Sequence, residues 1–204
     1  MTEEKVSEQK IKVFRSSGEA ILSGAVLKLK EKFQDFVTPY PNNAKEATVV
    51  VKKEKLTEIL NYLKTEESLK FDYLSDLTAV HFPEDEFQLV VVYHLFSLER
   101  KDFLRVKVEL KNGETIPSVV SIWPSANWME REAYDLMGLV FDGHPNLKRI
   151  LLPDDWEGHP LRKEYPLGGA QENEIRANKY GKPFLLPDDL EEAKKIIEEG
   201  KNER

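Results

Sequence analysis

The sequence predicts an α+β fold: helices packed on an antiparallel-dominated sheet, followed by a long extended C-terminal segment that ends in a short helix. Apolar residues recur at helical spacing in residues 22–33 and 56–63. Strand-like stretches then follow one another between residues 71 and 124, separated only by short turn-like sequences. Connections this short imply that consecutive strands pair antiparallel.

These patterns divide the chain into segments. Residues 1–17 are polar and irregular and are expected to form an N-terminal arm. Residues 18–140 form the expected globular domain. Residues 141–184 are expected to be an extended segment that wraps a partner protein, and residues 185–204 a C-terminal helix and end.

Each element of the globular domain has its own pattern. Leu22, Val26, Leu29 and Phe33 lie on one helical face, and residues 56–63 give a second amphipathic helix. The predicted strands are "ATVVV" (47–51), "FDYLSDLTAVHF" (71–82), "FQLVVVYHLFSL" (87–98), "LRVKVEL" (104–110) and "PSVVSIWP" (117–124). In residues 87–98 both alternating sets are mostly apolar, which indicates a central strand covered on both faces.

The stretch "NWMEREAYDLMG" (127–138) predicts the helix that closes the domain. Asn127 and Glu130 have the spacing of a capping box, and Gly138 is a natural stop. The expected buried stripe consists of Met129, Ala133, Leu136 and Met137.

Two charges in this helix are poorly explained by helix stability. Arg131 in the first turn and Asp135 in the last turn both oppose the helix dipole. Their mutual pairing, in the order Arg then Asp, contributes at most a few tenths of a kcal/mol. They either pair with each other as an ordinary solvated ion pair, or they pair with groups elsewhere in this chain or in another protein.

Composition excludes several classes of function. The 204 residues include 30 Lys and Arg against 37 Asp and Glu, without the basic stripe that nucleic-acid binding needs. There is no cysteine, so the chain holds no disulfide, thiolate zinc site or cysteine-ligated iron–sulfur cluster. No apolar run approaches the roughly 20 residues that span a bilayer, and the charged start lacks a signal-peptide core. A soluble protein of the cytoplasmic side is expected.

Residues 141–184 show no sustained period but carry many large apolar residues, which a disordered tail avoids. Five prolines stiffen the segment, so it loses less entropy when it binds along another protein. The sequence "LLPDDWEG" (151–158) recurs as "LLPDDLEE" (185–192). The second copy opens the predicted terminal helix, whereas Gly158, His159 and Pro160 limit the first to a tight corner.

An acid–base or metal cluster is the chemical alternative for this region. Its candidate residues are His144, Asp154, Asp155, Glu157 and His159, and it would make the chain a free-standing metal-dependent hydrolase. The sequence lacks the H-E-x-x-H spacing of a zinc site and any phosphate loop or nucleophile elbow. Catalysis by this chain alone is therefore not expected, and His81 and His94, in strand patterns, are interpreted as structural.

The stretch "EREAYDLMGLVFDGHPNLKRILLPDDWEGHPLRKEYPL" (130–167) resembles the signature region of the 30 kDa subunit family of respiratory complex I, the proton-translocating NADH:quinone oxidoreductase. "FDYLSDLTAVHF" also resembles the family's domain. Position by position, the motif nominates a partner interface made of Glu130, Arg131, Glu132, Asp135, His144, Pro145, Arg149, Pro153, Asp154, Asp155, Trp156, Glu157, Gly158, His159, Pro160, Leu161, Arg162, Tyr165 and Pro166.

The resemblance implies a structural subunit without flavin, cluster or quinone-reducing residue of its own. Such a subunit docks on the hydrogenase-like large subunit (49 kDa type) and neighbouring iron–sulfur subunits of the peripheral arm, at the cytoplasmic side of the cell membrane. FMN, iron–sulfur clusters and quinone belong to the assembled complex. A related membrane-bound hydrogenase or F420-type dehydrogenase complex is the alternative. Trp156 and Tyr165 are the expected apolar anchors, and Asp155 and Arg162 the expected charge-paired positions.

Overall fold

The computed structural model describes residues 22–41 and 46–165. The predicted arm (1–17), the end of the wrapping segment (166–184) and the terminal helix (185–204) lie outside these ranges. Helices α1, α2 and α3 span Gly24–Phe33, Leu56–Thr65 and Ala126–Met137, and short 3-10 turns η1 and η2 span Gln34–Phe36 and Lys53–Lys55. The strands are β1 (Val37–Pro39), β2 (Ala47–Val51), β3 (Tyr73–His81), β4 (Leu89–Ser97), β5 (Asp102–Leu110), β6 (Ile116–Pro117) and β7 (Phe141–Asp142).

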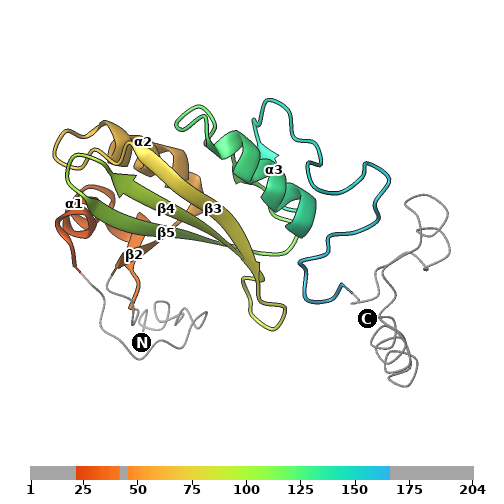
Figure 1. The fold of residues 1–204 in the computed structure, drawn as a ribbon. Coiled ribbons are helices and arrows are strands. Elements are labelled where there is room, and N and C mark those ends of the chain that lie inside the picture. Colours follow the sequence, from red (N-terminus) through yellow and green to blue (C-terminus); the bar gives the residue numbers. More distant parts are fainter. Residues whose placement is uncertain (1–21, 42–45, 166–204) are drawn as a thin grey trace, which may run out of the picture. The chain divides into compact units, whose positions relative to one another are not determined.

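Five of the strands form one sheet in the order β1-β2-β5-β4-β3 (Figure 1). The pairs β1·β2, β4·β5 and β3·β4 are antiparallel, and only β2 and β5 run parallel. The sheet is therefore antiparallel-dominated, and the predicted α+β fold is confirmed.

The two N-terminal helices cover one face of this sheet. The buried residues of α1 and α2 pack in one core with Leu89, Val91, Tyr93 and Leu95, which are alternate residues of β4. The predicted amphipathic helices are thus confirmed, with one shift. The Ser23 side chain caps α1 by accepting a hydrogen bond from the Val26 amide, so Leu22 precedes the helix and is exposed.

Strand β4 is an interior strand with apolar residues on both faces, as predicted. On the face away from α1 and α2, Val90 and Val92 are buried in a second, smaller cluster with Val80, Phe82 and Phe87. Farther along the same face, His94 and Phe96 are half-buried.

The predicted strand at 117–124 is wrong. Only Ile116–Pro117 is a strand, and it pairs in parallel with β7. The Ile122 and Trp123 amides both donate to the Val119 carbonyl at 2.9 Å, which folds this stretch into a turn. Its apolar residues are buried because the turn packs into the core that includes α3, so they resemble a strand without belonging to one.

The predicted start of α3 is also wrong, whereas its stop is confirmed. The helix begins at Ala126, and the Glu130 side chain accepts from the Ser118 hydroxyl and the Val119 amide instead of closing a capping box at Asn127. Gly138 ends the helix in the left-handed conformation, with φ 69°. Within the predicted stripe Ala133 and Met137 are buried, and Met129 and Leu136 are half-buried.

The first compact unit of the chain runs to Tyr165. Residues 143–165, which we name the return segment, therefore belong to this compact unit. They lie beyond residue 140, where the regular sequence pattern of the globular domain ended. Within the described ranges, no helix has the length and apolar character needed to cross a membrane.

Candidate functional site

Asp135 is the centre of the contacts between α3 and the return segment. Its side chain is fully buried. One carboxylate oxygen accepts a hydrogen bond from Arg149 Nη1 at 2.7 Å. The other accepts from three consecutive amides, those of Ile150, Leu151 and Leu152, at 3.0, 2.8 and 2.9 Å.

These partners decide the charge of Asp135. Burial alone raises the pKa of a carboxyl group, and it is the largest single influence here. The hydrogen bonds from the three amides and Arg149 together outweigh it, so the pKa of Asp135 lies below its ordinary value. The group is an ionised carboxylate held in a closely fitted set of donors.

Arg149 extends this contact along the return segment. Its Nη1 also donates to the Asp135 carbonyl at 3.2 Å, and its Nη2 donates to the carbonyls of Trp156 and Gly158 at 2.9 and 3.2 Å. One guanidinium therefore holds both the helix end and the corner at residues 153–158, where the Trp156 amide donates to the Pro153 carbonyl. The prediction that residues 151–158 form a tight corner and not a helix is confirmed.

The return segment also caps the C-terminus of α3. A helix leaves its last four carbonyls without partners inside the helix. His159 Nδ1 lies 2.9 Å from the Asp135 carbonyl, the Leu161 amide donates to Leu136 at 3.0 Å, and Arg162 Nε donates to Met137 at 2.6 Å. Because a carbonyl only accepts, Nδ1 of His159 carries the proton.

Arg131 binds the same segment from the preceding turn of α3. Its Nε donates to the Lys148 carbonyl at 3.1 Å and its Nη2 to the Arg149 carbonyl at 3.0 Å, while the guanidinium lies 5.3 Å from the centre of the exposed Trp128 ring. Of the two alternatives left open for Arg131 and Asp135, tertiary pairing is therefore the one observed.

The described end of the return segment reaches the sheet. The Lys163 amide donates to Nδ1 of His81, which is buried on β3, at 3.1 Å. A Glu164 carboxylate oxygen lies equally close to that nitrogen. Burial is the main influence on His81 and lowers its pKa, so the neutral ring that accepts from the amide is favoured over an ion pair with the exposed Glu164.

The histidines and acids of the metal hypothesis have separate roles. His144 binds the Asn127 carbonyl and accepts from the Asn146 amide, and His159 binds α3. Asp154, Asp155 and Glu157 are exposed. In the described part of the chain, no three or more His, Cys, Asp or Glu side chains come together as a possible metal site.

Residues 49–171 match the family described as the respiratory-chain NADH dehydrogenase 30 kDa subunit. The chain belongs to this family. It is 50% identical over 147 residues to the C subunit of NADH-quinone oxidoreductase from Geobacter metallireducens, covering 71% of this chain and 90% of that one. It is 47% identical over 146 residues to the protein of the same name from Geotalea uraniireducens, covering 71% and 88%.

A solved structure shares the fold. A chain in the membrane-bound sulfane sulfur reductase, an archaeal respiratory membrane complex, has a TM-score of 0.63 at 24% identity, covering 81% of this chain and 94% of that one. At this identity the likeness concerns the fold alone.

Many residues of the 30 kDa subunit family motif thus bind other parts of this same chain. Arg131, Asp135, Arg149, His159 and Arg162 meet at the C-terminal half of α3 and hold the return segment. Tyr165 closes on the segment itself, because its hydroxyl donates to the Glu157 carbonyl at 3.2 Å. Glu132, Pro145 and Leu161 are exposed, and Pro153, Trp156 and Pro160 are half-buried. Pro166 lies outside the described residues.

Glu130 has a role that its sequence pattern did not reveal. Its fully buried carboxylate accepts from the Val119 amide and the Ser118 hydroxyl, both at 2.7 Å. Burial raises the pKa of Glu130 to about 7 despite these two donors. The sequence held no signal for it, because the spacing from Asn127 already explained Glu130 as part of a capping box.

Proposed function

We propose that the chain takes the place of the 30 kDa subunit in a complex I-like NADH:quinone oxidoreductase, and that its role there is structural. The family match carries this proposal. The folded return segment supports it, because the segment presents the exposed apolar side chains Leu151 and Leu161, and α3, to which it is bound, presents the exposed Trp128. Exposed large apolar and aromatic groups next to a rigid element are typical of protein interfaces.

The contacts of the motif favour a structural role over a catalytic one. The ionisable groups of Arg131, Asp135, Arg149 and Arg162 bind backbone atoms or one another, and Arg162 also binds the Asn112 side chain. These charged groups therefore hold the return segment in its folded position. In the proposed complex, FMN, iron–sulfur clusters and quinone are held by other subunits, consistent with a chain that has no cysteine.

The proposed position is the peripheral arm at the cytoplasmic side of the cell membrane. There the chain would dock on the hydrogenase-like large subunit (49 kDa type) near the quinone site and next to iron–sulfur subunits. It would support electron transfer from NADH to quinone by fixing the geometry of these neighbours. Its association with the membrane would be through the complex.

Affinity purification of the tagged chain from native membranes in mild detergent tests the proposal. Mass spectrometry is expected to recover the large hydrogenase-like subunit and the cluster-bearing subunits in stoichiometric amounts. Recovery of the chain as a lone monomer would contradict a subunit role. The electron-input companions also distinguish an NADH-linked complex from a related hydrogenase or F420-type dehydrogenase complex, because those components differ.

A further inference from the structure

The sheet face away from α1 and α2 carries an aromatic row across three strands. Tyr73 on β3 is the register partner of Phe96 on β4, which is the partner of Phe103 on β5. The ring centres of Phe96 and Phe103 are 4.3 Å apart. Tyr73 and Phe103 are 49% and 56% exposed. Side chains paired across strands stand on one face, so Phe96 and Phe103 form an apolar ring pair with Tyr73 as the register neighbour on β3.

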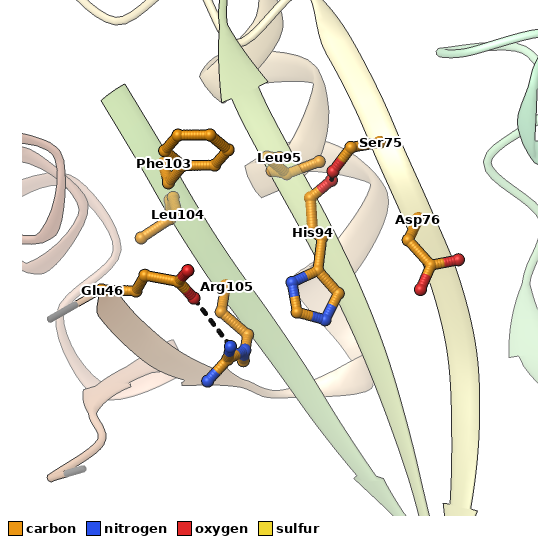
Figure 2. Close-up of a pocket in the computed structure, with 8 residues that line it drawn as sticks. All are labelled: Glu46, Ser75, Asp76, His94, Leu95, Phe103, Leu104 and Arg105. Carbon is orange, nitrogen blue, oxygen red and sulfur yellow. Dashed lines mark hydrogen bonds and ion pairs between the residues drawn. The ribbon is translucent and has the colours of Figure 1, made fainter. Parts of the chain in front are cut away.

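A polar row lies beside the aromatic one. Asp76, His94 and Arg105 are successive register partners on β3, β4 and β5, and Arg105 also makes an ion pair with Glu46 at 2.7 Å. Figure 2 shows these four polar side chains in line, with Phe103 next to them on β5. Together with the neighbouring residues they line an open hollow of about 280 Å³.

The charged side chains that line the hollow do not all pair with one another. Glu46 and Arg105 neutralise each other. Burial, and after it the charge of Arg105, lowers the pKa of His94, so the imidazole is neutral near pH 7. The Asp76 carboxylate is exposed and makes no hydrogen bond or ion pair with any residue of 22–41 or 46–165. The Lys107 charge also acts on His94, but its ammonium lies 4.0 Å from the centre of the Tyr40 ring. Among the lining residues, Asp76 is thus the charged group without a direct partner, and it lies beside the exposed Phe103 ring.

We propose that this hollow is a docking surface for an arginine-bearing segment of another subunit of the complex. The guanidinium would pair with the Asp76 carboxylate and stack on the Phe103 ring, while apolar neighbours in the same segment would cover Phe96 and Tyr73. Arginine fits because its planar cation binds carboxylates in a fixed geometry and also stacks on aromatic faces. Aromatic side chains and arginine are enriched in interface cores.

Two other occupants fit less well. A metal ion would need several ligands, and no such cluster exists among the described residues. An anionic ligand would meet the unpaired Asp76 and the partly exposed Glu46 beside an already paired Arg105. The inference rests on the proposed function, because it assumes that the chain assembles with other subunits.

The test uses the full complex purified through the tagged chain, with Asp76→Asn and Phe103→Ala introduced separately. Each variant is expected to reduce the recovery of companion subunits, relative to the tagged chain, about tenfold or more, the effect of truncating an interface anchor. Thr78→Ala, an exposed position on β3 outside both rows, is the matched control and should leave recovery unchanged. Because all three side chains are exposed or accessible on the surface, the fold should persist in each variant, and thermal unfolding of the purified chains checks this.

The outcomes separate the two proposals. If the unmodified chain recovers no companions, the proposed function fails. If it recovers them and both variants match the Thr78→Ala control, the docking surface alone is overturned. A second experiment identifies the occupant: Phe103 is replaced with the photoreactive p-benzoylphenylalanine, and the cross-linked peptides are sequenced. Cross-links to an arginine-containing peptide of another subunit support the proposal, and cross-links confined to this chain overturn it.

Discussion

Asp135 and Arg149, fourteen residues apart in the chain, form a buried ion pair of 2.7 Å between the last turn of α3 and the return segment. Backbone atoms bind both groups as well: three amides of the return segment donate to Asp135, and Arg149 donates to carbonyls on the two sides of the contact. Because both buried groups are hydrogen-bonded in this way, the pair stabilises this arrangement of the return segment over other arrangements. Removal of one member leaves an uncompensated charge, which is the costly event.

Asp135→Asn is therefore expected to lower the free energy of unfolding by about 3 kcal/mol or more. The asparagine side chain keeps the shape of the aspartate but loses the negative charge that Arg149 and the three backbone N–H groups bind. Its NH₂ group would also face these donors. Denaturant unfolding of the full chain measures the change. Glu132→Gln, on the exposed side of the same helix, is the control and should leave the midpoint within experimental error. Equal midpoints for the two variants would show that the pair does not stabilise the fold.

Gly138→Ala should destabilise the chain more than Gly113→Ala. Both glycines have positive φ, 69° and 82°, so both replacements incur the left-handed cost of about 1–2 kcal/mol. A Cβ at 138 would also lie 2.5 Å from Cδ2 of His159, whereas a Cβ at 113 meets nothing within 4 Å. The difference between the two thermal unfolding midpoints isolates the contact with His159. A difference near zero would mean that the imidazole moves away at no cost.

The sequence predicted those parts of the fold whose residues keep a regular period. Helices α1 and α2 and strands β2 to β5 follow their apolar patterns because one face of each packs on a single core. The turn at 118–124 misled the prediction, since its apolar residues are buried without a strand partner. Glu130 had a capping-box spacing, but its carboxylate is more fully satisfied by Ser118 and Val119.

The contacts of the return segment could be anticipated only in part. Asp135 lies in the last turn of α3 and opposes the helix dipole, which indicated a partner outside the helix, whereas Arg131 is the sixth residue of α3 and not in the predicted first turn. The identity of that partner depends on a chain reversal after Gly138 that no local period encodes. The aromatic and polar rows could not be predicted at all, because they need the strand register. A shift of one residue would place the same side chains on the opposite face.

Glu130 should make stability depend on pH near neutrality. Its pKa is raised by burial from an ordinary 4.5 to about 7, so the folded chain binds the proton more tightly than the unfolded chain. Its contribution is fully present below pH 4.5 and is lost as the pH rises to about 7, a change of about 3 kcal/mol. The buried Tyr93 phenol nearby stays neutral over this range, because burial raises its pKa well above the ordinary value.

Glu130→Gln tests this dependence, since glutamine can still accept from Val119 and bind the Ser118 hydroxyl. The variant is expected to show a flatter profile of unfolding free energy between pH 5 and 8, and to exceed the unmodified chain above about pH 7. Asp135, whose pKa is lowered, acts in the opposite sense at acid pH, where its contribution is lost as the pH falls. Identical pH profiles for Glu130→Gln and the unmodified chain would contradict the role assigned to this carboxyl.

Trp156→Ala distinguishes an interface anchor from a side chain that serves only the chain's own packing. The residue is half-buried, and Arg149 is held to its backbone carbonyl, which the substitution keeps. The expected cost is therefore about 2 kcal/mol or more in assembly with the proposed partner subunits, and little in unfolding of the isolated chain. Recovery of companions through the tagged variant and its thermal unfolding are measured together. Full recovery combined with a large drop in the unfolding midpoint would place Trp156 in the core of this chain, because an anchor for a partner would lose binding while its own fold persisted.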